Sequence, residues 1–179
     1  MKKYYAFLAL FLLAQFSLAQ ATFEYDAAGN RVKRNVTVAP DLSPIMYVLP
    51  SIIYGTQPLS VVIKVFEIVP VPTPGVVTVY LTKNTSTITL NLNPSTTFVN
   101  GIPVQNGQWT MDATSNPNYY ILTTTTPIAA LSSLNIGLTG NFIAIGQGTT
   151  SFSVTVFPLA GELNLSNNTA SSKLNYFAY

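Results

Sequence analysis

Ser151-Phe152-Ser153-Val154-Thr155-Val156-Phe157 is the stretch that decides the fold. Every even position is apolar, and two of the three odd positions that follow Ser151 carry hydroxyl groups. Successive side chains of an extended strand point to opposite faces, so this alternation predicts a strand with one buried and one solvated face. Residues 76–83 and 86–92 alternate in the same way. The pattern is typical of an antiparallel sheet that covers a core on one side.

Strand-like runs recur along the chain, separated by turns rich in glycine, proline and asparagine at spacings of about 8 to 14 residues. The candidate strands are residues 45–49, 59–69, 76–83, 86–91, 108–112, 119–124, 132–138, 149–157 and 170–177. No window has a convincing helical period, and the 12 prolines forbid long helices. The sequence therefore predicts an all-β protein, a sandwich or a barrel.

The first 19 residues have the three regions of a secretory signal peptide. Two lysines precede an uncharged run over residues 4–18, and Ser17-Leu18-Ala19 supplies the small residues that a signal peptidase requires, so that Gln20 would begin the mature chain. A membrane-spanning helix needs about 20 apolar residues, which is longer than this run. We expect a secreted, extracellular or cell-surface bacterial protein with no membrane span after cleavage.

Residues 20–40 are expected to form a β-hairpin and a linker. Within them, Tyr25-Asp26-Ala27-Ala28-Gly29-Asn30-Arg31 closely resembles one YD repeat of the Rhs/YD-repeat family. Such repeats build long β-rich shells on bacterial surface proteins and toxins, and one copy cannot bury its own apolar face. We therefore interpret the motif as a solitary hairpin or a relic of an Rhs-type protein, or simply as a tether between export signal and domain.

Residues 41–179 are expected to form the main domain, and they resemble the Ig-like secreted repeat modules of Bacteroidota, related to DUF11 and CARDB domains. The matching motifs, in chain order, are residues 40–44 (PDLSP), 61–68 (VVIKVFEI), 72–79 (PTPGVVTV), 109–111 (WTM) and 161–170 (GELNLSNNTA). The resemblance implies an Ig-like antiparallel β-sandwich of about 7–9 strands. It also implies an extracellular spacer, adhesion or assembly role with no active site. Such modules usually occur in long multidomain chains, whereas this chain reaches Tyr179 just after its last candidate strand.

The residue inventory excludes several kinds of chemistry. The chain has no histidine and no cysteine, so it has no Ser-His-Asp triad, no histidine- or thiolate-ligated metal and no disulfide. Only 8% of the residues are charged, and Lys2 and Lys3 account for the whole net charge of +2. Nucleic-acid binding requires clustered lysine and arginine, so we expect no nucleic-acid partner.

Four carboxylates of the main domain, well separated in sequence, are the remaining candidates for catalysis: Asp41, Glu67, Asp112 and Glu162. Glycoside hydrolysis needs two carboxylates about 5 to 10 Å apart. We expect Asp41 and Glu162 to be solvated, and Glu67 to be partly buried and paired with Lys64 or Lys83. The prediction is therefore a non-enzyme with no catalytic residue, no cofactor and no metal.

Aromatic side chains are the best candidates for ligand contact, because an aromatic ring offers a face for stacking. Tyr80, Tyr119 and Tyr120 are the possible contact residues, and Trp109 is expected to pack in the core as an Ig-like tryptophan does. Because Tyr119 and Tyr120 are adjacent in a strand, one of them should point inward.

Three functions remain open at this stage. The first is a structural or adhesion module that contacts a surface protein, the second a carbohydrate-binding module that uses surface aromatics, and the third a remnant of an Rhs-type surface protein. The apolar C-terminal segment, residues 173–179, is a candidate for strand-edge self-association, although pairing within the sandwich is the preferred interpretation.

Overall fold

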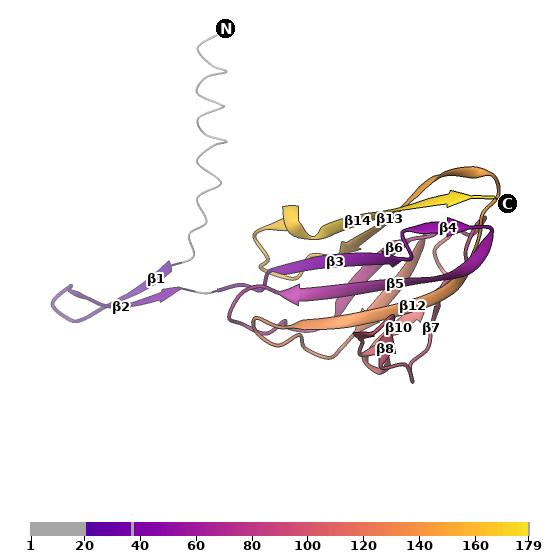
Figure 1. Ribbon diagram of the computed structural model, residues 1–179. Coiled ribbons are helices and arrows are strands. Elements are labelled where there is room, and N and C mark those ends of the chain that lie inside the picture. Colours follow the sequence, from indigo (N-terminus) through magenta and orange to yellow (C-terminus); the bar gives the residue numbers. More distant parts are fainter. Residues whose placement is uncertain (1–20, 37, 179) are drawn as a thin grey trace, which may run out of the picture. The chain divides into compact units, whose positions relative to one another are not determined.

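The computed structural model describes residues 21–36 and 38–178 (Figure 1). The expected signal peptide, residues 1–19, lies outside this part of the chain. The described residues belong to two compact units, one that ends at Val38 and one that begins at Ala39.

The larger unit is a sandwich of two sheets, which confirms the predicted fold class (Figure 1). In spatial order, the first sheet contains β10 (Thr110–Asp112), β11 (Tyr119–Thr124), β6 (Val77–Thr82), β13 (Gln147–Val156), β14 (Thr169–Phe177) and β4 (Ile52–Tyr54). The second sheet contains β3 (Leu42–Leu49), β5 (Thr56–Glu67), β12 (Ser133–Ile143) and β7 (Asn91–Leu92). Ten strands thus form the two sheets in the described chain, against the 7–9 expected, because β4, β7 and β10 are only two or three residues long.

Strands within each sheet pair antiparallel, apart from the parallel pair of β14 and β4. Between β3 and β5, which are neighbours in one sheet, the chain crosses to the other sheet and adds β4 there. Gly55 lies between β4 and β5 with a φ of 64°, a conformation that favours glycine. Residues 175–177 of β14 therefore have a strand on each side, so this part of the C-terminal segment pairs within the sandwich.

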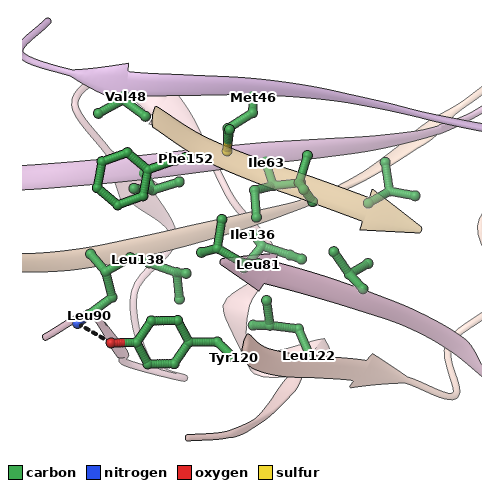
Figure 2. Close-up of a cluster of buried hydrophobic side chains, with 14 of the residues drawn as sticks. Met46, Val48, Ile63, Leu81, Leu90, Tyr120, Leu122, Ile136, Leu138 and Phe152 are labelled. Carbon is green, nitrogen blue, oxygen red and sulfur yellow. Dashed lines mark hydrogen bonds between the residues drawn. The ribbon is translucent and has the colours of Figure 1, made fainter. Parts of the chain in front are cut away.

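The core lies between the sheets and follows the period-two pattern of the sequence (Figure 2). In β6, buried residues alternate with half-buried ones along the whole strand. Fully burying one such aliphatic side chain stabilises the fold by about 1.5–3 kcal/mol. Tyr120 is buried among these side chains, and its hydroxyl accepts a 3.0 Å hydrogen bond from the main-chain N–H of Leu90. Trp109 is buried as well, as expected for an Ig-like core.

The prediction of a full strand over residues 86–91 is wrong. Ile88 and Leu90 are buried as the alternation requires, but regular pairing is confined to β7, and Ile88 makes only an isolated bridge to Phe142. Instead of pairing regularly, the main chain of this segment packs closely against β12. Its Thr89 carbonyl oxygen lies so close to Gly140 that a Cβ there would be 2.3 Å from it.

A short hairpin, β8 (Phe98–Val99) and β9 (Ile102–Pro103), covers part of the outer face of the four-stranded sheet. Val99 and Val104 pack there with Val62 in a second, smaller apolar cluster. Gly137 permits this approach, since a Cβ at that position would be 2.5 Å from a Val99 methyl group.

Asn106, in the 3-10 turn η2 (Asn106–Gln108), closes the adjacent edge of β12. Its side-chain amide donates to the carbonyl oxygen of Gly137 at 2.8 Å and accepts from the Gly137 N–H at 2.7 Å. One side chain thus replaces the hydrogen bonds that a neighbouring strand would make, and buried main-chain groups at this position stay satisfied.

The smaller unit is a hairpin of β1 (Ala21–Tyr25) and β2 (Arg31–Val36). Asp26 holds its turn, because its Oδ1 accepts hydrogen bonds from the N–H groups of Ala28 and Asn30. These hydrogen bonds, the one from the Asn30 N–H first, lower the pKa of Asp26 from its ordinary value. Gly29 adopts a φ of 82°, as a turn at this position requires.

Candidate binding face

The outer face of the six-stranded sheet is the candidate functional surface, and we call it the binding face. It consists of the side chains that alternate with the buried ones along the strands. The binding face includes Tyr54, Tyr80, Tyr119, Thr149, Ser151, Ser153, Thr155, Phe157, Thr169, Ser171, Lys173, Asn175 and Phe177. The corresponding face of the other sheet is partly covered by the β8–β9 hairpin.

Three aromatic rings form a row across β11, β6 and the end of β13, which we call the aromatic row. Tyr80 pairs with Ile121 of β11 and with Thr155 of β13, so Tyr119 and Phe157 are its diagonal neighbours. The Tyr80 and Tyr119 rings are 5.8 Å apart at 88°, and the Tyr80 and Phe157 rings are 6.2 Å apart at 50°. Both separations lie in the range that aromatic pairs prefer.

The aromatic row is accessible to a partner. Tyr119 is 38% exposed and Phe157 is 59% exposed, whereas Tyr80 between them is half-buried. Contiguous apolar patches on a protein surface often mark interaction sites, so these three neighbouring rings are a candidate contact region.

A second aromatic pair lies at the other end of β13. Phe177 of β14 pairs with Gln147, the first residue of β13, and on its other side with Tyr54 of β4. The Tyr54 and Phe177 rings stack with centroids 5.3 Å apart and an interplanar angle of 20°. Because Phe157 follows the last residue of β13, the two aromatic groups mark opposite ends of that strand.

Between these groups, the outward side chains of β13 and β14 form a polar strip, which we call the trough: Thr149, Ser151, Ser153, Thr155, Thr169, Ser171, Lys173 and Asn175. Opposite residues carry matching polar groups, with Ser153 facing Ser171 and Thr155 facing Thr169. These residues line an open hollow of about 450 Å³, and a second hollow of about 340 Å³ lies between Gln147 and Phe177. The surface is thus hollowed towards both ends of the trough, and the serine, threonine and asparagine side chains there both donate and accept hydrogen bonds.

One charged side chain lies in the trough. Lys173 is exposed and faces Ser151 across the strand pair. No aspartate or glutamate occurs in β13 or β14, so these two strands offer no neighbouring anion to Lys173. The trough is therefore weakly cationic at its middle and uncharged towards both ends.

Of the three predicted contact residues, Tyr80 and Tyr119 lie together on the binding face, whereas Tyr120 does not lie on this face. Tyr120 is 2% exposed and lies in the core, so it cannot be part of a contact surface. Phe157 and Phe177 were not predicted. Phe157 has a visible signal in the sequence, because it occupies an odd position in residues 151–157 and thus falls on the polar side of its strand.

The carboxylates of Asp41, Glu67 and Glu162 belong to segments that meet near the start of β3. Both oxygens of Glu162 accept hydrogen bonds from main-chain N–H groups, one from Leu42 at 2.8 Å and one from Leu159 at 2.9 Å. Glu67 accepts from the N–H groups of Asp41 and Val69. The expectation that Glu162 is solvated is wrong, since it is 9% exposed. It is buried because its loop folds back to bond the first residue of β3.

Burial raises the pKa of Glu67 above its ordinary value, against the opposing effect of the N–H group of Asp41. The side chain is 1% exposed and its Oε2 has no hydrogen-bond partner. The two expected cations lie elsewhere: Lys64 lies over the Tyr47 ring at 5.9 Å, and Lys83 donates to the carbonyl oxygens of Ala113 and Asn116. The expected pairing of Glu67 with either lysine is therefore wrong.

Asp112, the fourth carboxylate, stabilises the loop that follows β10. Its Oδ1 accepts hydrogen bonds from the N–H groups of Thr114 and Ser115. Hydrogen bonds from Ser115 are the main cause of a pKa well below the usual range of an aspartate. Across residues 21–36 and 38–178, no three acidic residues lie close enough together to hold a metal ion.

Comparison with known proteins identifies the fold. No family model matches the sequence, and no curated protein does. Among solved structures, a cohesin module from a family 33 glycoside hydrolase of Clostridium perfringens has a TM-score of 0.51 at 9% identity, over 80% of this chain and 100% of the module. The sandwich has a cohesin-like fold. At this identity the similarity concerns the fold alone.

Two further structures show weaker similarity. A CARDB domain from Pyrococcus furiosus, solved in complex with di-metal ions, has a TM-score of 0.47 at 16% identity and covers 81% of this chain and 100% of its own. The N-terminal domain of PorA has a TM-score of 0.36 at 12% identity and covers 88% of this chain and 97% of its own. Within the described residues, no helix has the length and apolar character needed to cross a membrane.

Proposed function

We propose that this chain is a non-catalytic module of the cell exterior that attaches to a partner through the binding face. The aromatic row is the observation that carries the proposal, because it places three neighbouring rings, two of them exposed, across three strands of a sheet. Burying such rings against a partner is favourable, and aromatic residues are enriched where proteins bind.

The absence of catalysis is part of the proposal, and the placement of the carboxylates supports it. Glu162 and Glu67 bind main-chain N–H groups at the start of β3, so they hold a strand in place rather than face a substrate. Asp112 is likewise occupied by its own loop. The cohesin comparison offers an analogy only, a sandwich of this fold that is one module of a larger protein.

A cell-binding experiment tests the proposal. The labelled protein is incubated with intact cells of the organism that produces it, together with a double variant, Tyr80→Ala with Phe157→Ala. We expect the double variant to lose most of the binding. Tyr47→Ala is the matched control, because Tyr47 is a 40% exposed aromatic residue on the other sheet. Equal binding by the double variant and the wild type would show that the binding face has no such role.

The hairpin supports a second candidate: the chain is a remnant of an Rhs-type surface protein. Its turn is held by Asp26 and Gly29 of the YD-like motif, which is the one observation that favours this origin. The genomic neighbourhood decides the matter. Adjacent genes that encode arrays of YD repeats would support the remnant, and a separately expressed gene without such neighbours would exclude it.

A further inference from the structure

The polar middle of the binding face limits what its partner can be. Protein partners usually contact a patch whose centre is apolar or aromatic and whose rim is polar. Here the order is reversed, because serine, threonine and asparagine side chains fill the trough and the rings lie at its two ends. Such a surface suits a ligand that is itself covered with hydroxyl groups.

The shape of the trough adds a second limit. It follows β13, whose ten residues span about 33 Å. Phe157 lies beyond one end of this strand and Phe177 beside the other. A single small ligand could not reach both rings, whereas an extended chain of sugar rings could. The apolar faces of sugar rings stack on aromatic rings, and their hydroxyl groups bond to side chains that donate and accept.

One pair of hydrogen-bonding side chains in the trough is already ordered. The Thr149 hydroxyl donates to the Asn175 Oδ1 at 2.8 Å across the strand pair, which leaves the Asn175 amide hydrogens directed to other acceptors. The side chains project from regular antiparallel strands with nine residue pairs in register. The backbone and this pair therefore lose little conformational entropy when a ligand binds along the trough.

The charge of the trough selects among polysaccharides. Lys173 lies near its middle, and β13 and β14 contain no acidic residue. A chain that carries carboxylates would find one cation and no repulsion there, whereas a basic chain would be repelled. We propose that the trough binds a linear acidic polysaccharide, whose rings stack on Phe157 and Phe177 and whose carboxylates approach Lys173. This inference rests on the proposed role of the binding face.

Binding to two matched polymers tests the inference. Polygalacturonate carries a carboxylate on each sugar, and its fully methyl-esterified form is the same chain without the charges. We expect the full-length protein to bind polygalacturonate in isothermal titration calorimetry, and to bind the ester about two- to fivefold more weakly, which is the range for one exposed ion pair. Raising the salt concentration should remove the difference.

Variants assign the contacts. Lys173→Gln should make the two polymers bind equally, whereas Phe157→Ala and Phe177→Ala should each weaken both by about threefold or more. Tyr47→Ala should leave both affinities unchanged. Circular dichroism establishes that each variant is folded before its affinity is measured.

The outcomes separate this inference from the proposed function. If neither polymer binds, while the double variant of Tyr80 and Phe157 still fails to bind cells, the ligand is not an acidic polysaccharide but the binding face keeps its role. The same conclusion holds if a protein receptor accounts for the cell binding. If the double variant binds cells normally, the binding face itself has been assigned wrongly.

Discussion

At the scale of single residues, buried polar groups decide which positions tolerate substitution. Tyr120 and Glu67 are both almost inaccessible to water, yet each contacts main-chain N–H groups of a distant segment. A buried donor that loses its acceptor costs about 1–3 kcal/mol. These side chains therefore contribute to stability through the groups that they satisfy as well as through their own packing.

Removal of the Tyr120 hydroxyl isolates one such group. Tyr120→Phe keeps the ring in the core but leaves the Leu90 N–H without its 3.0 Å acceptor. We expect a loss of about 1–3 kcal/mol in the free energy of unfolding, measured by urea denaturation. Tyr119→Phe is the control and should change it by less than about 0.5 kcal/mol, since Tyr119 is on the surface. Equal stability of the two variants would contradict the role assigned to this hydroxyl.

Glu67 should make stability depend on pH. Its pKa is raised in the folded state, so the folded protein binds a proton that the unfolded chain releases more easily. The stabilising contribution is complete below the ordinary pKa of 4.5 and is lost as the pH rises through the raised, folded-state pKa. Glu67→Gln should flatten this part of the profile, as measured by the melting temperature between pH 4 and pH 8. An unchanged slope in the variant would rule out Glu67 as its source.

At the scale of secondary-structure elements, the length of a strand decided whether it could be predicted from the sequence. Strands β6 and β13 could be predicted because residues 76–83 and 151–157 alternate between two kinds of side chain over at least seven residues. Strands β4, β8 and β9 are two or three residues long, too short to show any period.

The candidate site was foreseen in part for the same reason. Tyr80 and Tyr119 could be proposed from the sequence, but their contact with Phe157 depends on the pairing of β6 with β11 and β13. The pairing of Phe177 with Tyr54 depends on a parallel strand contact between segments more than a hundred residues apart. Sequence alone does not specify such register, because it is set by packing across the whole sheet.

Gly140 in β12 tests how closely the segment before β7 packs on the sheet. An alanine Cβ there would lie 2.3 Å from the Thr89 carbonyl oxygen, so the main chain would have to move. We expect Gly140→Ala to lower the free energy of unfolding by about 1–3 kcal/mol. Thr139→Ala, at the exposed neighbouring position, serves as the control and should be nearly neutral. A neutral Gly140→Ala would mean that this segment is packed loosely.

At the scale of the whole molecule, the core belongs to the sandwich unit. Every buried residue of the main apolar cluster lies at or beyond Leu42, and the compact unit begins at Ala39. A chain that begins at Ala39 should therefore unfold cooperatively, with a melting temperature within about 4 °C of that of the longer chain, by circular dichroism. A larger decrease would show that residues before Ala39 contribute to its stability.

The parallel contact between β14 and β4 has a mechanical consequence. Strand β4 directly follows β3, so its contact with β14 places the end of β14 near the end of β3. The chain therefore enters the sandwich unit at one end of its long axis, and β14 ends at the other; we call these two ends the poles (Figure 1). Tension applied between these poles would pull β3 along β5 and β14 along β13, in shear, across eight and nine residue pairs. All the cross-strand hydrogen bonds of a sheared pair must break together rather than one after another, an arrangement that resists extension when a tethered protein is pulled by flow.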